Sequence, residues 1–111
     1  MENRPEILVY ACKADTAMLQ EICAGIEEEG VLYRVVEQRS TDLDLLSYQA
    51  ANDSVLGTGI GILGTQAAMQ MRTVEKGRNT FVLRTPLDWQ SRNLGANAAR
   101  AVKRVSFKQI Y

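Results

Sequence analysis

Hydrophobic and polar positions along the first half of the chain predict strands and helices in alternation. Residues 7–11, ILVYA, form a short apolar run of branched side chains, which is typical of a strand buried on both faces. Apolar residues then recur at helical spacing from Thr16, a suitable N-cap, to Gly30, a suitable C-terminal stop. Residues 31–38 predict a second strand, and a second helix begins at Leu43. This order implies parallel strands joined by right-handed helical crossovers.

The second half of the chain predicts a reversal of strand direction. Residues 58–63, TGIGIL, form a third strand in which glycine alternates with larger residues. Gly64-Thr65 leaves only a tight turn before residues 67–72, AAMQMR, so this fourth strand must run antiparallel to the third. Residues 80–84, TFVLR, predict a fifth strand. We therefore predict one α/β domain over residues 1–111, built on a mixed sheet.

The residues after the fifth strand predict a last helix. Thr85 is a suitable N-cap, and Pro86 fits the first helical position, where its missing N–H costs nothing. We expect this helix to reach about Arg104. One side of it carries the apolar residues Leu94, Ala98, Ala101, Val102 and Val105.

Small residues occupy residues 94–100, LGANAAR, within this last helix. Glycine costs up to about 1 kcal/mol relative to alanine in a helix, so its presence indicates a close approach. Either the sheet or a partner protein would explain the pattern. We include Asn97 and Arg100 among the candidate partner contacts.

Residues 59–64 match the glycine spacing of a dinucleotide-binding turn, GxGxxG. A true fingerprint follows the first strand, opens a helix and has an acidic residue about twenty positions later. Here the glycines lie inside a predicted strand, the next element is a hairpin partner, and position 84 is arginine. We therefore interpret Gly59 and Gly61 as places where a helix packs closely on the sheet or where a partner protein approaches.

The composition excludes several classes of protein. The chain has 111 residues, 46% of them hydrophobic, which suits one core. It contains no histidine, so the commonest general base is missing, and no catalytic residue is predicted. Cys12 and Cys23 lack a CxxC spacing and are expected to be buried reduced thiols. No apolar run is long enough for a bilayer and no signal-peptide pattern is present, so we expect a cytoplasmic protein without membrane contact.

Charge is balanced overall but divided along the chain. Residues 1–56 carry eleven acidic and four basic residues, and residues 57–111 carry two and nine. This division favours oriented docking on a charged partner, unless folding mixes the two halves into an ordinary surface. Zero net charge and dispersed aromatic residues argue against a nucleic-acid partner.

Glu27, Glu28 and Glu29 end the first predicted helix. A step of 100° per residue turns Glu28 almost directly away from the buried face, while the other two flank that face. Three acids at the negative end of a helix oppose its dipole, and no basic residue lies one turn away. A solvated face would explain them, and so would a metal ion or a basic partner that relieves the repulsion. All three are candidate partner contacts.

Three segments together resemble the small subunit of the diol and glycerol dehydratase reactivating factors. They are GIEEEGV (25–31), SVLGTGIG (54–61) and LGANAARAVK (94–103), in the same order and with similar spacing. The resemblance implies a three-layer α/β/α fold with a five-stranded mixed sheet and one antiparallel strand, similar to the dehydratase medium subunit and to anticodon-binding domains. Residues 67–79 have little that matches the family, so their contacts are not predicted.

The resemblance also implies a function. Such a chain is a non-catalytic partner of a large, Hsp70-like ATPase subunit, in a complex of two large and two small chains. The complex releases damaged cobalamin from adenosylcobalamin-dependent dehydratases by subunit exchange. ATP or ADP and Mg²⁺ bind in the complex, and no cofactor binds the isolated small chain. A glutamate of the family's GIEEEG motif contributes to the Mg²⁺ site, and the middle position here is Glu28.

Other functions stay open at this point. The medium subunit of the dehydratase itself is the nearest alternative, followed by a small nucleotide-binding enzyme and by an RNA-binding module with salt-sensitive affinity. Whether the client is a diol or a glycerol dehydratase is also open, as is association with a bacterial microcompartment.

Overall fold

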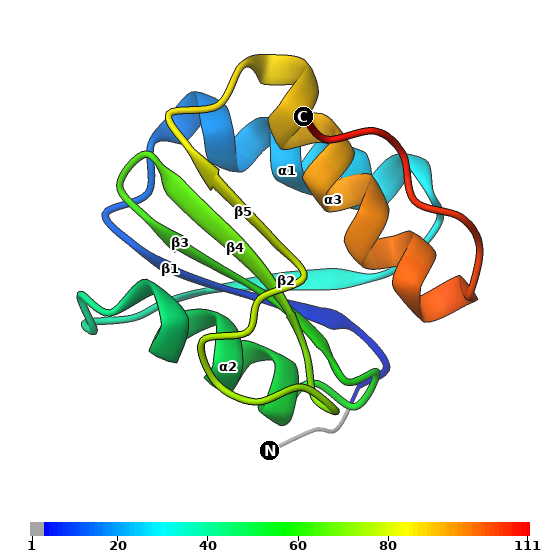
Figure 1. Cartoon of the computed structure of the whole chain (residues 1–111), viewed down its shortest axis with the longest axis horizontal. Helices are drawn as coiled ribbons and strands as arrows, with labels where there is room; N and C mark the ends of the chain where they lie inside the picture. The colour runs from blue at the N-terminus through cyan, green and yellow to red at the C-terminus, as the bar shows by residue number, and fades with distance from the viewer. Residues whose placement is uncertain (1–3) are drawn as a thin grey trace.

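Five strands form a single mixed sheet in a computed structural model that describes residues 4–111. Their order across the sheet is β2-β1-β3-β4-β5 (Figure 1). Strands β2, β1 and β3 are parallel, whereas β4 runs antiparallel to both β3 and β5, as predicted for the fourth strand. Each strand begins and ends within two residues of its predicted bounds. The observed bounds are β1 Ile7–Cys12, β2 Tyr33–Glu37, β3 Thr58–Leu63, β4 Gln66–Met71 and β5 Phe81–Arg84.

Three helices cover the two faces of this sheet. They are α1 Thr16–Glu28, α2 Leu43–Asp53 and α3 Asp88–Lys103. α1 and α3 lie side by side on one face, and α2 covers the other (Figure 1). The three-layer α/β/α fold is therefore confirmed. Within residues 4–111, none of the helices has the length and apolar character needed to cross a bilayer.

β1 is buried on both faces because it lies between two cores. Its odd-numbered side chains belong to the larger core under α1 and α3, and its even-numbered side chains belong to the smaller core under α2. The Tyr10 hydroxyl donates a 2.5 Å hydrogen bond to Asp53 at the end of α2, and burial together with this bond raises the pKa of Tyr10 to about 12. Cys12 is buried as predicted, whereas Cys23 on α1 is only partly buried.

Asp15, rather than the predicted Thr16, caps the start of α1. Its carboxylate accepts a hydrogen bond from the N–H of Met18 at 3.0 Å. A carboxylate satisfies a free N–H as a hydroxyl does and also places a negative charge at the positive end of the helix dipole. At the other end Gly30 has a φ of +76°, and the helix stops before it as predicted.

α3 begins two residues after its predicted start. Thr85 has a φ of +47°, and its N–H donates to a carbonyl of the β3–β4 turn, so it belongs to the sheet rather than to a helix cap. Leu87 holds the N-cap position, and its N–H donates to the side chain of Gln90 at 2.9 Å. At the C-terminal end Arg104 has a φ of +59°. The chain turns away there, which leaves Val105 exposed instead of on the predicted apolar side.

Two glycines of β3 allow α2 to lie directly on the sheet. A Cβ atom at Gly61 would lie 2.5 Å from the backbone nitrogen of Ser47, and one at Gly59 would lie 2.5 Å from the Cβ of Ala50. Neither position has room for a side chain. The assignment of Gly59 and Gly61 to a partner surface is therefore corrected, because α2 covers both. Their place inside a strand also lacks the helix start that a dinucleotide-binding turn requires.

We expect Gly61→Ala to lower the free energy of unfolding by about 3 kcal/mol, because the added methyl group overlaps the α2 backbone. Gly30→Ala is the control, since a Cβ there meets nothing within 4 Å and costs only the strain of a positive φ, about 1 kcal/mol. Urea unfolding followed by circular dichroism measures both. Equal losses in the two variants would show that α2 does not rest on Gly61.

Candidate functional site

α1 and α3 cross with their backbones in contact. A Cβ atom at Gly25 of α1 would overlap the carbonyl oxygen of Arg92 and lie 2.8 Å from the nitrogen of Ala96. A Cβ atom at Gly95 of α3 would likewise overlap the carbonyl oxygen of Ile22. These glycines belong to GIEEEGV and LGANAARAVK, so two of the three family segments form the two sides of one helix crossing. This contact positions the charged residues described next.

Arg92 joins two acidic residues of α1. Its Nε donates to Glu21 at 3.0 Å, and its Nη1 lies 3.1 Å from the carboxylate of Glu28. Glu21 and Glu28 are seven residues apart, so they lie on the same face of α1, on either side of the arginine. Half of the Glu28 side chain, 53%, is exposed. The outward direction predicted for Glu28 is consistent with this exposure, and its carboxylate lies on the outer surface of the helix pair.

Glu29 is held more tightly than its neighbours. Lys103 Nζ lies 2.8 Å from one carboxylate oxygen, and Arg100 Nε lies 3.1 Å from the other. Only 13% of the Glu29 side chain is exposed. The hydrogen bond from Lys103, followed by that from Arg100, holds the pKa of Glu29 below its usual value of 4.5, against the opposing effect of burial.

Lys103 also donates to the main-chain oxygen of Glu29 at 2.9 Å. A cation at this point satisfies a free carbonyl and opposes the negative end of the α1 dipole. No basic residue lies one turn away on α1, but Glu28 and Glu29 do have cationic partners in the folded chain. Their cations come from α3, more than sixty residues further along the chain.

These ion pairs join the acidic first half of the chain to the basic second half. A further contact of the same kind connects Lys76 with Asp42, 3.8 Å apart. Folding therefore mixes the two halves, which was the alternative to oriented docking. The exposed ends of these pairs still leave both signs of charge on the outer surface of α1 and α3.

The segment after α3 runs back along that helix (Figure 1). The Asn97 side chain is buried beneath this segment, donates to the carbonyl of Lys108 at 2.9 Å and accepts from its N–H at 2.6 Å. Asn93 and Gln90, one and two turns earlier, each donate to a further carbonyl of the segment. The prediction that Asn97 contacts a partner is corrected, because its side chain satisfies this chain's own backbone.

The structure thus brings together part of the predicted set of partner contacts. Glu27 and Glu28 are exposed, and Glu29 and Arg100 form the ion pair beside them. Among residues 4–111, no group of three or more histidine, cysteine, aspartate or glutamate residues is arranged to hold a metal ion. Glu28 can therefore supply one ligand to a metal, but this part of the chain does not build a complete metal site.

Arg92 is the functional candidate that the sequence analysis missed. Arg92 lies on α3 and its acidic partners lie on α1, so it does not occur within one helical turn of those acids in the sequence. The seven-residue spacing of Glu21 and Glu28 was the available signal, since it places two carboxylates on one face with room for a cation between them.

Nearly the whole described chain matches a known family. A family model described as "Dehydratase medium subunit" matches residues 4–108, and the chain therefore belongs to this family. It is 31% identical over 108 residues to the propanediol dehydratase-reactivating factor small subunit of Citrobacter freundii, a match that covers 96% of this chain and 93% of that protein. It is 29% identical to the diol dehydratase-reactivating factor small subunit of Klebsiella michiganensis, over 97% of this chain and 87% of that protein.

Solved structures agree with this assignment. A chain from the structure of diol dehydratase-reactivating factor complexed with ADP and Mg²⁺ has a TM-score of 0.90 and 27% identity, over 96% of this chain and 99% of that chain. A chain of glycerol dehydratase reactivase has a TM-score of 0.90 and 25% identity, over 97% and 100%. The resemblance drawn from the three segments is confirmed.

We expect the contribution of Glu29 to stability to disappear in acid. Because its pKa is lowered in the folded state, its ion pairs stabilise the fold above pH 4.5 and are lost as the pH falls below that value. At pH 7, Glu29→Gln should lower the free energy of unfolding by about 1 kcal/mol. Urea unfolding at pH 7 and pH 3 measures the difference, with Glu75→Gln in an exposed loop as the control. If Glu29→Gln lowered the free energy of unfolding by the same amount at both pH values, this role would be contradicted.

Proposed function

We propose that this chain is the non-catalytic small subunit of a reactivating factor for an adenosylcobalamin-dependent diol or glycerol dehydratase. One observation carries the proposal: sequence and fold match reactivating factor small subunits along nearly the whole length of both chains. In this proposal the chain binds a large, Hsp70-like subunit that hydrolyses ATP, in a complex of two large and two small chains. It works in the cytoplasm or in a bacterial microcompartment.

The alternatives have less support. The relatives named above are reactivating factor subunits rather than dehydratase subunits. A nucleotide-binding enzyme would need the glycine segment to present its N–H groups to a phosphate, but Gly59 and Gly61 pair within the sheet and lie under α2. The chain would therefore meet nucleotide only through its large partner.

The outer surface of α1 and α3 is the partner-facing surface in this proposal. It carries the exposed pair Glu28–Arg92 and the neighbouring Glu27. Among the described residues, no large exposed hydrophobic side chain belongs to α1, and Trp89 is the one on α3. Permanent interfaces are typically large and apolar, whereas polar ones dissociate more readily. A surface of this kind suits a subunit that must leave its large partner and exchange onto the dehydratase.

Glu28 is the residue that would supply an oxygen to Mg²⁺. Mg²⁺ commonly takes one or two carboxylates, phosphate oxygens and water rather than a complete protein cage, so a single exposed carboxylate fits the ion. The large subunit and its nucleotide would supply the other ligands. Arg92 holds the Glu28 carboxylate at 3.1 Å and fixes its position on the helix surface. When bound, Mg²⁺ would link the nucleotide on the large subunit to the small chain.

Co-expression with a tagged large subunit tests the proposal. We expect stoichiometric co-elution in size-exclusion chromatography that changes when ADP is replaced by ATP in the presence of Mg²⁺. Absence of association in every nucleotide state would contradict the proposal. The chain should then be tested against the large subunit of the dehydratase, as the medium-subunit alternative requires.

We expect Glu28→Gln to weaken the Mg²⁺-dependent association at least tenfold, roughly the loss seen when groups supporting a metal site are removed. The fold should not change, because the side chain is half exposed and contributes to no core. Glu75→Gln removes the same charge from an exposed loop and serves as the control. The affinity of each variant for the large subunit is measured with and without Mg²⁺. An unchanged Mg²⁺ dependence in Glu28→Gln would remove this residue from the site.

A further inference from the structure

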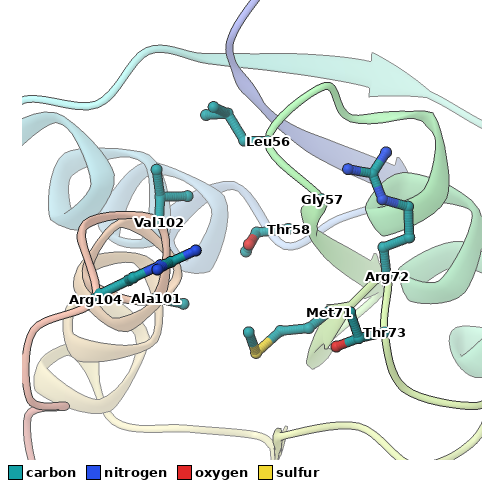
Figure 2. Close-up of a pocket in the computed structure, with 9 residues that line it drawn as sticks. All are labelled: Leu56, Gly57, Thr58, Met71, Arg72, Thr73, Ala101, Val102 and Arg104. Carbon is teal, nitrogen blue, oxygen red and sulfur yellow. The ribbon is translucent and has the colours of Figure 1, made fainter.

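A cavity of about 250 Å³ lies between the last turn of α3 and the sheet, where β3 begins and β4 ends (Figure 2). Its size is slightly below the range of about 300–1,000 Å³ that is usual for drug-sized ligands. It therefore suits a small molecule. The lining residues are Leu56, Gly57, Thr58, Met71, Arg72, Thr73, Ala101, Val102 and Arg104.

Thr58 and Arg104 are polar side chains of this lining that have no partner within the described residues. Thr58 is 2% exposed, and its hydroxyl makes no hydrogen bond although it lines the cavity. Arg104 is an exposed residue that forms neither a hydrogen bond nor an ion pair through its guanidinium group, and Figure 2 shows this side chain extending toward Thr58. Both groups open onto the cavity, so a ligand held there can hydrogen-bond to the hydroxyl and pair with the cation at the same time.

The second arginine of the cavity, Arg72, already has hydrogen-bond partners. Arg72 donates to the main-chain oxygens of Ser54 and Val55, at 3.3 and 3.4 Å, and Figure 2 shows it directed away from the cavity centre. The guanidinium of Arg72 therefore holds the loop before β3 in place. Arg104 is left as the one arginine of the lining that is free to bind an anion.

We propose that this cavity binds a small carboxylate that carries a short apolar chain. The Arg104 guanidinium can meet both carboxylate oxygens with two parallel N–H groups, and the Thr58 hydroxyl can donate to one of them. Leu56, Met71 and Val102 supply apolar surface for the chain. This site does not depend on the proposed function, and it lies apart from Glu28 and Arg92.

A carboxylate fits better than a phosphate on grounds of charge. One free guanidinium neutralises one negative charge, whereas a phosphate monoester carries between one and a half and two, roughly, at neutral pH. The last turn of α3 borders the cavity, and the negative end of its dipole opposes a doubly charged anion more strongly than a singly charged one.

Titration of the ¹⁵N-labelled full chain with butanoate tests the site. We expect chemical shift changes at residues of the lining, with a Kd in about the millimolar range for a ligand of so few atoms. Butanamide has the same shape without the charge, and inorganic phosphate has the charge without the apolar chain. Neither should shift these signals at the same concentrations. Equal responses to all three probes would overturn the proposal.

Three variants locate the binding groups. R104Q should weaken butanoate binding at least tenfold, because it removes a hydrogen bond from a charged group. T58V replaces the hydroxyl with a methyl group of similar size and should weaken binding by a smaller factor. R39Q removes an exposed arginine from the loop after β2 and should bind as the original chain does. Amide spectra show whether each variant is folded. Equal weakening by R39Q and R104Q would show nonspecific attraction and overturn the assignment.

Discussion

The close crossing of α1 and α3 is the contact on which the rest of this structure depends. Gly25 and Gly95 each cost about 1 kcal/mol of helix stability relative to alanine, yet both are required because each faces the backbone of the other helix. The short distance between the helix axes brings Arg92, Arg100 and Lys103 of α3 to the acids of α1. The charged surface that we assign to a partner is therefore a consequence of two glycines.

Glycines also allow close helix packing on the opposite face of the sheet, where α2 lies. Gly59 and Gly61 admit α2 so closely that another protein cannot contact these two glycines. On α3, the buried side-chain amide of Asn97 holds the C-terminal segment through two hydrogen bonds to the backbone of Lys108. These small and polar residues serve the fold, and the outer surface of α1 and α3 is left for function. The same sequence feature, glycine inside a regular element, thus lets α2 pack on one face of the sheet and joins α1 to α3 on the other.

The sheet could be predicted from the sequence because its signals are local. A two-residue turn forces β4 to run antiparallel, and the apolar run of β1 requires cover on both faces. The outward direction of Glu28 follows from helix geometry. The partners of Glu28 and Glu29 could not be predicted, because they lie more than sixty residues away and only the helix crossing brings them close. The start of α3 was misplaced for a similar reason: Thr85 bonds to a turn of the sheet rather than to its own helix.

In the complex that we propose, the charged outer surface of α1 and α3 faces the large subunit. The most direct test is to add unlabelled large subunit with ADP and Mg²⁺ to the ¹⁵N-labelled chain and record which amide signals broaden. We expect broadening first at Glu28 and Arg92, with the exposed side of α2, such as Gln49, unaffected at the same ratio. Broadening confined to α2, with unchanged signals on α1 and α3, would contradict it.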